Sequence, residues 1–262
     1  MRRRLACGSL LALSLAAQAA PCPQPLRIGF NDTPFPPALL GRGAAFADPP
    51  GWVVVAVRDA LQRLGCPARL LRLPGRRLTL ALQRGDIEFA LFYGATPERV
   101  AAFAFPLDAT GQPDAAWAPM LGHLAFYGLA GSPALKAWDG TTLAPGVRVG
   151  VVGGSTQELL ARERGWPVSV ASAFDTSVLA LKARRFDLLL ASRESVLPSH
   201  LEGESALVEL SPLVQRLPYY VPASAAAQAR HGEFVTAFWR EVCHASRRAM
   251  PEARGLDCGK KP

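Results

Sequence analysis

Short apolar segments alternate with segments of helical periodicity along most of this sequence, and this alternation limits the possible folds more than any other feature. The first set comprises a strand at 27–30, a helix at 51–65, a strand at 68–73, a helix at 76–84 and a strand at 87–92. The helix at 51–65 repeats apolar residues on one face and ends at Gly65, with Pro67 beyond. Two successive strand–helix–strand units predict a parallel sheet flanked by helices.

A second alternation follows in the other half of the chain. It comprises a strand at 147–152, a helix at 155–164, a strand at 168–170, a helix at 175–185 capped by Asp175, and a strand at 187–191. The apolar segment 121–129 predicts a strand that leaves the first lobe, and 219–221 predicts a strand that returns to it. The segment 233–250 presents apolar residues on one face and predicts a last helix. We therefore expect an α/β protein of two lobes, with 25–124 and 217–262 in lobe 1 and 125–216 in lobe 2.

The first residues have the composition of an export signal. Three arginines at 2–4 precede an apolar run at 10–17, and Ala17-Gln18-Ala19 provides a small-residue cleavage site. The run is too short to span a bilayer. We expect a signal peptide at 1–19 and a periplasmic, monomeric mature protein. Loss of the three arginines lowers the formal charge from +8 to +5, and no basic block follows, so we expect no nucleic-acid partner.

Cysteine use agrees with an oxidising compartment, because the expected mature chain has four cysteines. Four cysteines allow three pairings. Cys22 and Cys66 each precede a strand, and neighbouring parallel strands would bring them together, which favours Cys22–Cys66 and leaves Cys243–Cys258. No Cys-x-x-Cys occurs and the four histidines are scattered, so we expect neither a metal nor a cofactor.

Arg99 is the first candidate for ligand binding. It lies in Gly94-Ala95-Thr96-Pro97-Glu98-Arg99, where Thr96 can cap a helix that has proline in its first turn. A cation there opposes the helix dipole, and a bidentate hydrogen bond to a ligand carboxylate would offset that cost. The alternative is a surface arginine paired with Glu98 or Asp108.

A second anion site is predicted at the start of the helix at 155–164. Glycines precede Ser155-Thr156-Gln157-Glu158, which fits a capping box with Ser155 as the cap. The free N–H groups of the first turn favour an anion. The pattern lacks the lysine of a P-loop and the spacing of a nucleophile elbow. The alternative is an ordinary capped helix.

Other candidates follow the predicted strands. Phe35, Phe92 and Tyr93 could line an apolar pocket, although aromatic residues in such places also form cores. Asp32 could meet an ammonium group or serve as a turn residue.

The order of these segments resembles the family 3 solute-binding proteins of bacterial importers, which serve polar amino acids. The resemblance runs from about residue 26 to 250 and is densest at 51–65, 82–99 and 147–156. It implies the two-lobe type II periplasmic-binding-protein fold. It also implies that Arg99 and the backbone N–H of Thr156 clamp an α-carboxylate while the lobes close over the ligand.

The sequence departs from that family where the ligand's amine is bound. The usual aspartate falls on Ser192, five residues after Asp187. Phe92 and Tyr93 replace small polar residues and leave only Gly94. A carboxylate with an apolar or aromatic body therefore fits better than a lysine-like or histidine-like ligand.

Three functions remain open from the sequence. The first is a binding protein that delivers a small carboxylate or amino acid to a membrane permease of the ABC type or to a membrane sensor. The second is an enzyme similar to the exported cyclohexadienyl dehydratases, with Glu194 or Asp32 as general acid. The third is an accessory or sensory protein that has lost tight ligand binding.

Overall fold

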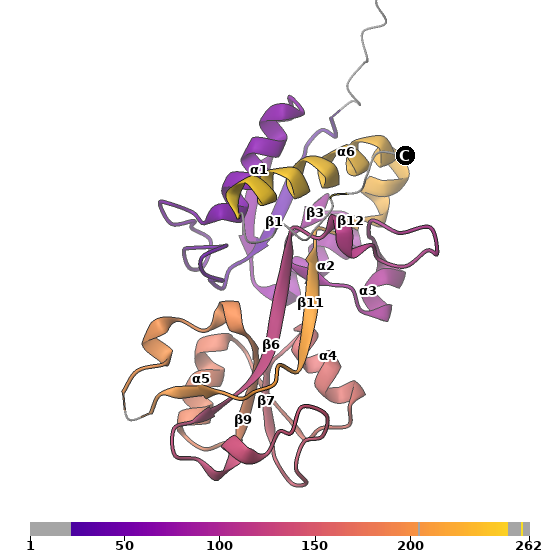
Figure 1. The fold of residues 1–262 in the computed structure, drawn as a ribbon. Helices are drawn as coiled ribbons and strands as arrows, with labels where there is room; N and C mark the ends of the chain where they lie inside the picture. Colours follow the sequence, from indigo (N-terminus) through magenta and orange to yellow (C-terminus); the bar gives the residue numbers. More distant parts are fainter. Residues whose placement is uncertain (1–21, 204, 251–257, 259–262) are drawn as a thin grey trace, which may run out of the picture.

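Two β-sheets organise the computed structural model, which describes residues 22–203, 205–250 and 258 (Figure 1). The first sheet has five strands in the order β2-β1-β3-β12-β5. The second has seven, in the order β4-β11-β6-β9-β7-β8, with β10 beside β6. The expected signal peptide at 1–19 lies outside the described residues. We call the part built on the first sheet lobe 1 and the part built on the second sheet lobe 2.

Lobe 1 realises the first predicted alternation. Its strands are β1 (Arg27–Asn31), β2 (Arg69–Leu73), β3 (Phe89–Ala90), β5 (Phe103–Ala104) and β12 (Ala223–Ser224). Its helices are α1 (Trp52–Arg63), α2 (Gly75–Arg84), α3 (Pro97–Ala102) and α6 (Ala225–Ala249). Strand β1 pairs in parallel with both β2 and β3, as the strand–helix–strand units predict.

Lobe 2 repeats this arrangement with the second alternation. Its strands are β4 (Tyr93–Gly94), β6 (Met120–Leu129), β7 (Val149–Val152), β8 (Val168–Ala171), β9 (Leu188–Ser192), β10 (Leu207–Glu209) and β11 (Gln215–Tyr220). Its helices are α4 (Thr156–Glu163) and α5 (Phe174–Lys182). Strand β7 pairs in parallel with β8 and β9, so the central strand and its two neighbours repeat the order seen in lobe 1.

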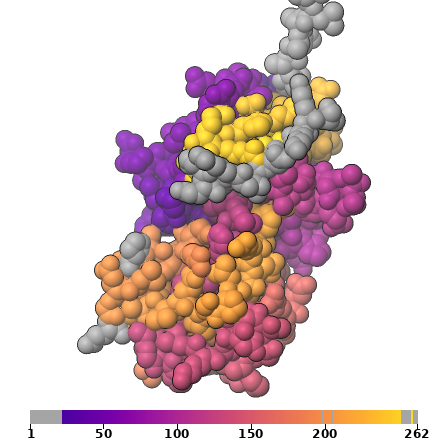
Figure 2. Space-filling model, viewed as in Figure 1, coloured from indigo at the N-terminus to yellow at the C-terminus, as the bar shows by residue number. Residues whose placement is uncertain are grey.

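The two lobes are joined by antiparallel strands. Strands β6 and β11 lie side by side between the two bodies of the molecule, with Leu124 opposite Gln215 and Met120 opposite Tyr219 (Figure 1). The short strand β4 pairs with the end of β11. In the space-filling view the early and last parts of the chain form one body and the middle part forms most of the other (Figure 2). The boundaries 25–124, 217–262 and 125–216 stay a prediction.

Each lobe has its own apolar core. In lobe 1, α1 and α6 cover the sheet, and the ring centroid of Phe89 lies 4.3 Å from that of Phe238. In lobe 2, Phe126 packs against Trp138 and Trp166 at centroid distances of 5.3 and 5.1 Å. No helix among the described residues has the length and the apolar character needed to cross a bilayer.

The predicted strand at 87–92 is wrong in one respect, because the chain changes sheets there. Strand β3 ends at Ala90, and β4 begins at Tyr93 in the other sheet. Phe92 between them has a φ of 65°, in the left-handed region that a residue with a Cβ seldom adopts. This turn directs the chain from lobe 1 to lobe 2, and the apolar composition of 87–92 does not reveal it.

Two predicted helix starts are also corrected. Helix α5 begins at Phe174, so Asp175 lies in its first turn and Ala173 is the cap residue. The last helix begins at Ala225 rather than 233, because Ser224 caps it by accepting a hydrogen bond from the Ala227 N–H at 3.1 Å. The backbone at His231 is non-helical and interrupts α6, just before the predicted helix start at 233.

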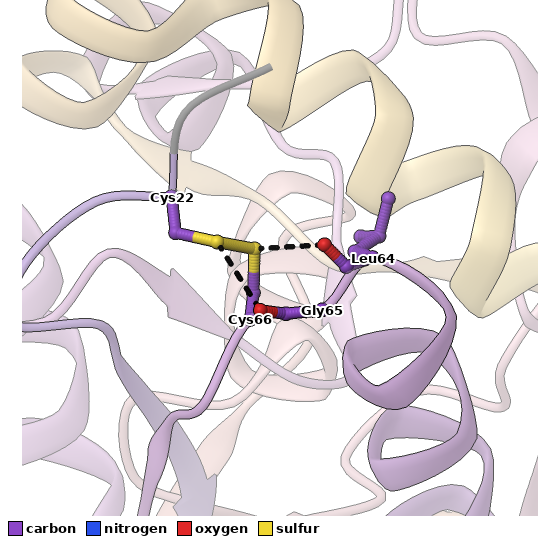
Figure 3. Close-up of a disulfide and its surroundings, with 4 residues drawn as sticks. All are labelled: Cys22, Leu64, Gly65 and Cys66. Atoms are coloured by element: carbon purple, nitrogen blue, oxygen red, sulfur yellow. Dashed lines mark hydrogen bonds between the residues drawn. A yellow bond between two sulfur atoms is a disulfide. The ribbon is translucent and has the colours of Figure 1, made fainter. Parts of the chain in front are cut away.

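Two disulfides join the predicted cysteine pairs. Cys22 bonds to Cys66 and Cys243 bonds to Cys258, with Cα–Cα distances of 5.7 and 5.5 Å. Figure 3 shows the first bond beside the backbone carbonyls of Leu64 and Gly65, at the end of α1. The parallel pairing of β1 with β2 places the starts of these strands together, which is the reason given above for Cys22–Cys66.

The longer disulfide loop is expected to contribute more to stability. The two bonds close sequence separations of 44 and 15 residues. Chain entropy then predicts that replacing Cys22 and Cys66 by alanine lowers the free energy of unfolding by about 1 kcal/mol more than replacing Cys243 and Cys258. Urea unfolding of the two double variants measures the difference. An equal loss in both would show that the loop-entropy account is wrong for this protein.

Candidate functional site

Arg99 is positioned by a capped helix that follows β4. Pro97 occupies the first turn of α3, and Thr96 caps it by accepting a hydrogen bond from the Arg99 N–H at 3.4 Å. The guanidinium carbon of Arg99 lies 4.8 Å from the centre of the Tyr93 ring. A guanidinium over an aromatic ring is an attractive arrangement, which holds the half-buried Arg99 side chain in place.

The Arg99 guanidinium crosses from lobe 1 to lobe 2. Nη1 donates to the Gly94 carbonyl at 3.1 Å and to the Thr156 hydroxyl at 2.8 Å, and Nη2 donates to the Gly154 carbonyl at 3.1 Å. Among the described residues Arg99 forms no ion pair, so Glu98 and Asp108 are not its partners. The two candidate anion sites of the sequence, 57 residues apart, therefore meet in space.

The start of α4 brings free N–H groups to the same place. Ser155 caps the helix by accepting from the Glu158 N–H at 3.1 Å, as predicted. The Glu158 carboxylate accepts from the Gly154 N–H at 2.7 Å, whereas the capping-box interpretation placed this bond on Ser155. Gly154 has a φ of 74°, which allows the tight turn before α4. The Ser155 N–H donates to the Val152 carbonyl within this turn at 3.3 Å, and both Ser155 and Thr156 line the cavity.

Gly94 is required by the close approach of β4 to the start of α4. A Cβ at this position would lie 2.8 Å from Thr156 Oγ1 and 3.0 Å from its Cγ2. Any side chain would therefore push the start of α4 away from Arg99. In the structure Gly94 provides space, and its carbonyl accepts a hydrogen bond from Arg99. Its expected contact with a ligand stays a prediction.

A cavity of about 180 Å³ lies where these elements meet. This is smaller than the range of about 300–1,000 Å³ that suits drug-sized ligands. Seven of the predicted site residues line it: Phe35, Phe92, Tyr93, Arg99, Ser155, Thr156 and Ser192. Asp32 instead lines a neighbouring cleft of about 660 Å³, where Arg42 of lobe 1 forms an ion pair with Asp175 of lobe 2.

Aromatic rings form one wall of the cavity. The ring centroid of Phe35 lies 5.4 Å from that of Phe92 and 5.9 Å from that of Tyr219, and the Phe92 and Tyr219 centroids are 6.2 Å apart. These rings come from three separate segments. Phe35 lies in the loop between β1 and α1, Phe92 lies in the turn between β3 and β4, and Tyr219 lies in β11. Their mutual packing gives a rigid apolar surface opposite the polar start of α4.

A neutral polar corner adjoins this wall at the end of β9, because Tyr219 belongs to both. The Gln157 amide nitrogen donates to Ser192 Oγ at 3.0 Å, and Ser192 Oγ lies 2.6 Å from the Tyr219 hydroxyl. Ser192 and Tyr219 are buried. The sequence analysis found neither Gln157 nor Tyr219. The helix cap could have pointed to Gln157 in the first turn of α4, whereas no local signal marks Tyr219.

The electrostatics of the cavity are dominated by one positive charge. Arg99 is the only charged side chain among the described residues that line it. Burial lowers the pKa of Arg99 from its ordinary value, but an arginine keeps its charge at neutral pH. The cavity therefore combines one fixed cation, the positive end of α4, neutral hydroxyl and amide groups, and an apolar wall. Among the described residues no group of three or more potential metal ligands is clustered.

Comparison with solved structures identifies the architecture. The ligand-binding core of GluR0 from Nostoc punctiforme, in complex with L-glutamate, aligns with a TM-score of 0.64 and 16% identity over 88% of this chain and 97% of its own. An arginine third transport system periplasmic binding protein from Legionella pneumophila aligns with a TM-score of 0.65 and 15% identity, over 88% and 97% of the two chains. The chain has the two-lobe type II periplasmic-binding-protein fold.

A third structure with this fold is the ancestral amino-acid-binding protein AncCDT-1, a precursor of cyclohexadienyl dehydratase. It aligns with a TM-score of 0.61 and 15% identity over 88% of this chain and 92% of its own. No protein-family profile and no curated protein sequence matches the chain. At such low identities the likeness establishes the fold, and the function has to be argued from the cavity itself.

The tyrosines make the folded state sensitive to alkaline pH. Burial raises the pKa of all four tyrosines of the chain, to about 12 for Tyr219 and Tyr220. An unfolded tyrosine titrates near pH 10. Above about pH 10 the unfolded state therefore loses protons that the folded state keeps, and the free energy of unfolding falls as the pH rises.

The absorbance of tyrosinate measures this effect. We expect the native protein to ionise its tyrosines well above the pH at which the urea-denatured protein does. Coincident titrations of the two forms near pH 10 would contradict the burial of these four hydroxyl groups.

Proposed function

We propose that this protein binds a small carboxylate or amino acid in the cavity between its two lobes. The observation that supports this most is the meeting of the Arg99 guanidinium with the start of α4 across the cavity. Guanidinium geometry matches a carboxylate, and the N–H groups of a first helical turn favour an anion. The solved structures of the same fold include an amino-acid-binding protein and a glutamate complex.

The carboxylate would be bound from both lobes at once. Arg99 belongs to lobe 1 and Thr156 to lobe 2, and each already reaches the other by a 2.8 Å hydrogen bond. A carboxylate oxygen at this position accepts from both sides, so binding energy is gained only when the lobes are together. This coupling lets a membrane partner distinguish the loaded protein from the empty one. The partner we propose is a permease of the ABC type or a membrane sensor, reached by an exported, periplasmic protein.

The enzyme alternative receives little support from the cavity. The sequence named Glu194 or Asp32 as the general acid of a dehydratase-like reaction. Asp32 lines the neighbouring cleft, and the Glu194 carboxylate accepts from the His123 backbone N–H at 3.3 Å and lies 2.8 Å from the His123 ring. No acidic side chain among the described residues lines the cavity. A general acid would need to touch the substrate there.

Removal of the Arg99 side chain is expected to abolish binding. A thermal-shift screen of amino acids and organic acids identifies ligands, and calorimetry gives their affinity. Loss of a buried charged hydrogen-bond partner costs about 2–5 kcal/mol of binding free energy. The substitution Arg99→Ala should therefore lower the affinity for every ligand by about thirtyfold or more. Arg63→Ala is the matched control, because Arg63 forms an exposed pair with Asp59 within α1. A ligand that binds Arg99→Ala undiminished would exclude Arg99 as the anchor.

A further inference from the structure

The cavity offers no counter-charge to an ammonium group. Arg99 is the only charged group among the described lining residues. Asp32 and Asp175 line the neighbouring cleft, and Glu194 is bonded to the backbone and ring of His123. The amine of a buried amino acid would therefore lie near a cation with no anion beside it. Burial of an unpaired charge is strongly unfavourable.

The hydrogen bonds of the polar corner leave a donor for the ligand. Ser192 and Tyr219 share one hydrogen between their oxygens, 2.6 Å apart, and Gln157 donates to Ser192 as well. Whichever hydroxyl donates in this pair, the hydrogen of the other is left over. No hydrogen bond among the described residues uses that hydroxyl hydrogen. The corner thus complements an acceptor oxygen.

The remaining surface complements an apolar group. The rings of Phe35 and Phe92 and the ring of Tyr219 pack together on the cavity wall. A side chain placed against them gains from burial of apolar area. The three parts of the cavity therefore call for an anion, an uncharged oxygen and an apolar body in one small molecule.

We propose that the ligand is a 2-oxo monocarboxylate with an apolar or aromatic body, bound in preference to the corresponding amino acid. This inference rests on the proposed function, because Arg99 and α4 bind the carboxylate. The oxo oxygen accepts the free hydrogen of the Ser192–Tyr219 pair, and the body lies against Phe35 and Phe92. The same corner that favours the oxo oxygen leaves an ammonium group without a partner charge.

A matched series of ligands tests the preference. Calorimetry compares phenylpyruvate, hydrocinnamate and phenylalanine, which share the aromatic body and the carboxylate and differ in the second polar group. The 2-oxo acid of leucine and leucine itself form an aliphatic pair. We expect the affinity for each oxo acid to be at least about tenfold higher than the affinity for its amino acid. Hydrocinnamate should bind with lower affinity than phenylpyruvate.

A conservative variant tests the hydroxyl. Tyr219→Phe keeps the aromatic wall and removes the hydroxyl of the corner. It should therefore lower the affinity for phenylpyruvate by about tenfold and leave the affinity for hydrocinnamate unchanged. Tyr220→Phe is the control, because Tyr220 neighbours it on β11 and donates to the Pro113 carbonyl at 3.2 Å, away from the cavity. Equal affinity of Tyr219→Phe and the unmodified protein for phenylpyruvate would overturn the role of the corner.

The outcomes separate this inference from the proposed function. If phenylalanine binds as tightly as phenylpyruvate or more tightly, the 2-oxo preference is wrong while carboxylate binding stands. If no carboxylate in a broad screen binds, the proposed function fails and this inference fails with it.

Discussion

The arrangement of the two lobes depends most on the side chain of Arg99. Its guanidinium lies over the ring of Tyr93 in β4 and donates to the Thr156 hydroxyl and the Gly154 carbonyl of lobe 2. Burying a guanidinium costs free energy, and here hydrogen bonds to neutral acceptors offset part of that cost. Gly94 permits the approach because a side chain there would collide with Thr156. The cation is thus placed in a small cavity that offers it no negative charge among the described residues.

The rest of the cavity decides what accompanies that negative charge. At the end of β9 the chain presents Ser192, which is buried and bonded to Gln157 and Tyr219 rather than to an ion. The rings of Phe35 and Phe92, which pack against Tyr219, add an apolar surface to the same cavity. A cation at the start of α4 and a neutral remainder would select against a second charge on the ligand, because burying a charge without a partner is strongly unfavourable.

Much of the fold could be predicted because apolar periodicity and the residues that end helices are local features of the sequence. Strand β1 and helix α1 follow from apolar spacing with a terminating Gly65, and the Cys22–Cys66 disulfide follows from the order of strands, which leaves Cys243–Cys258 as the second pair. The errors lie where a long-range contact decides a local conformation. The chain leaves one sheet for the other at Phe92. Its positive φ is maintained by packing of the Phe92 ring against Phe35 and Tyr219. Helix α6 begins early because Ser224 caps it after a short strand in lobe 1.

The sequence by itself determined the two-lobe α/β pattern and the helix starts at Pro97 and Thr156, which we propose as the two parts of an anion site. These depend on spacing within segments of about ten to twenty residues, where neighbours in sequence are neighbours in space. Only the tertiary structure decided which side chains share a cavity. It brought Tyr219 of β11 to Ser192 of β9, and it placed Asp32 in the neighbouring cleft. Such meetings depend on how strands cross between lobes and on which way each side chain points, and neither is encoded in local spacing.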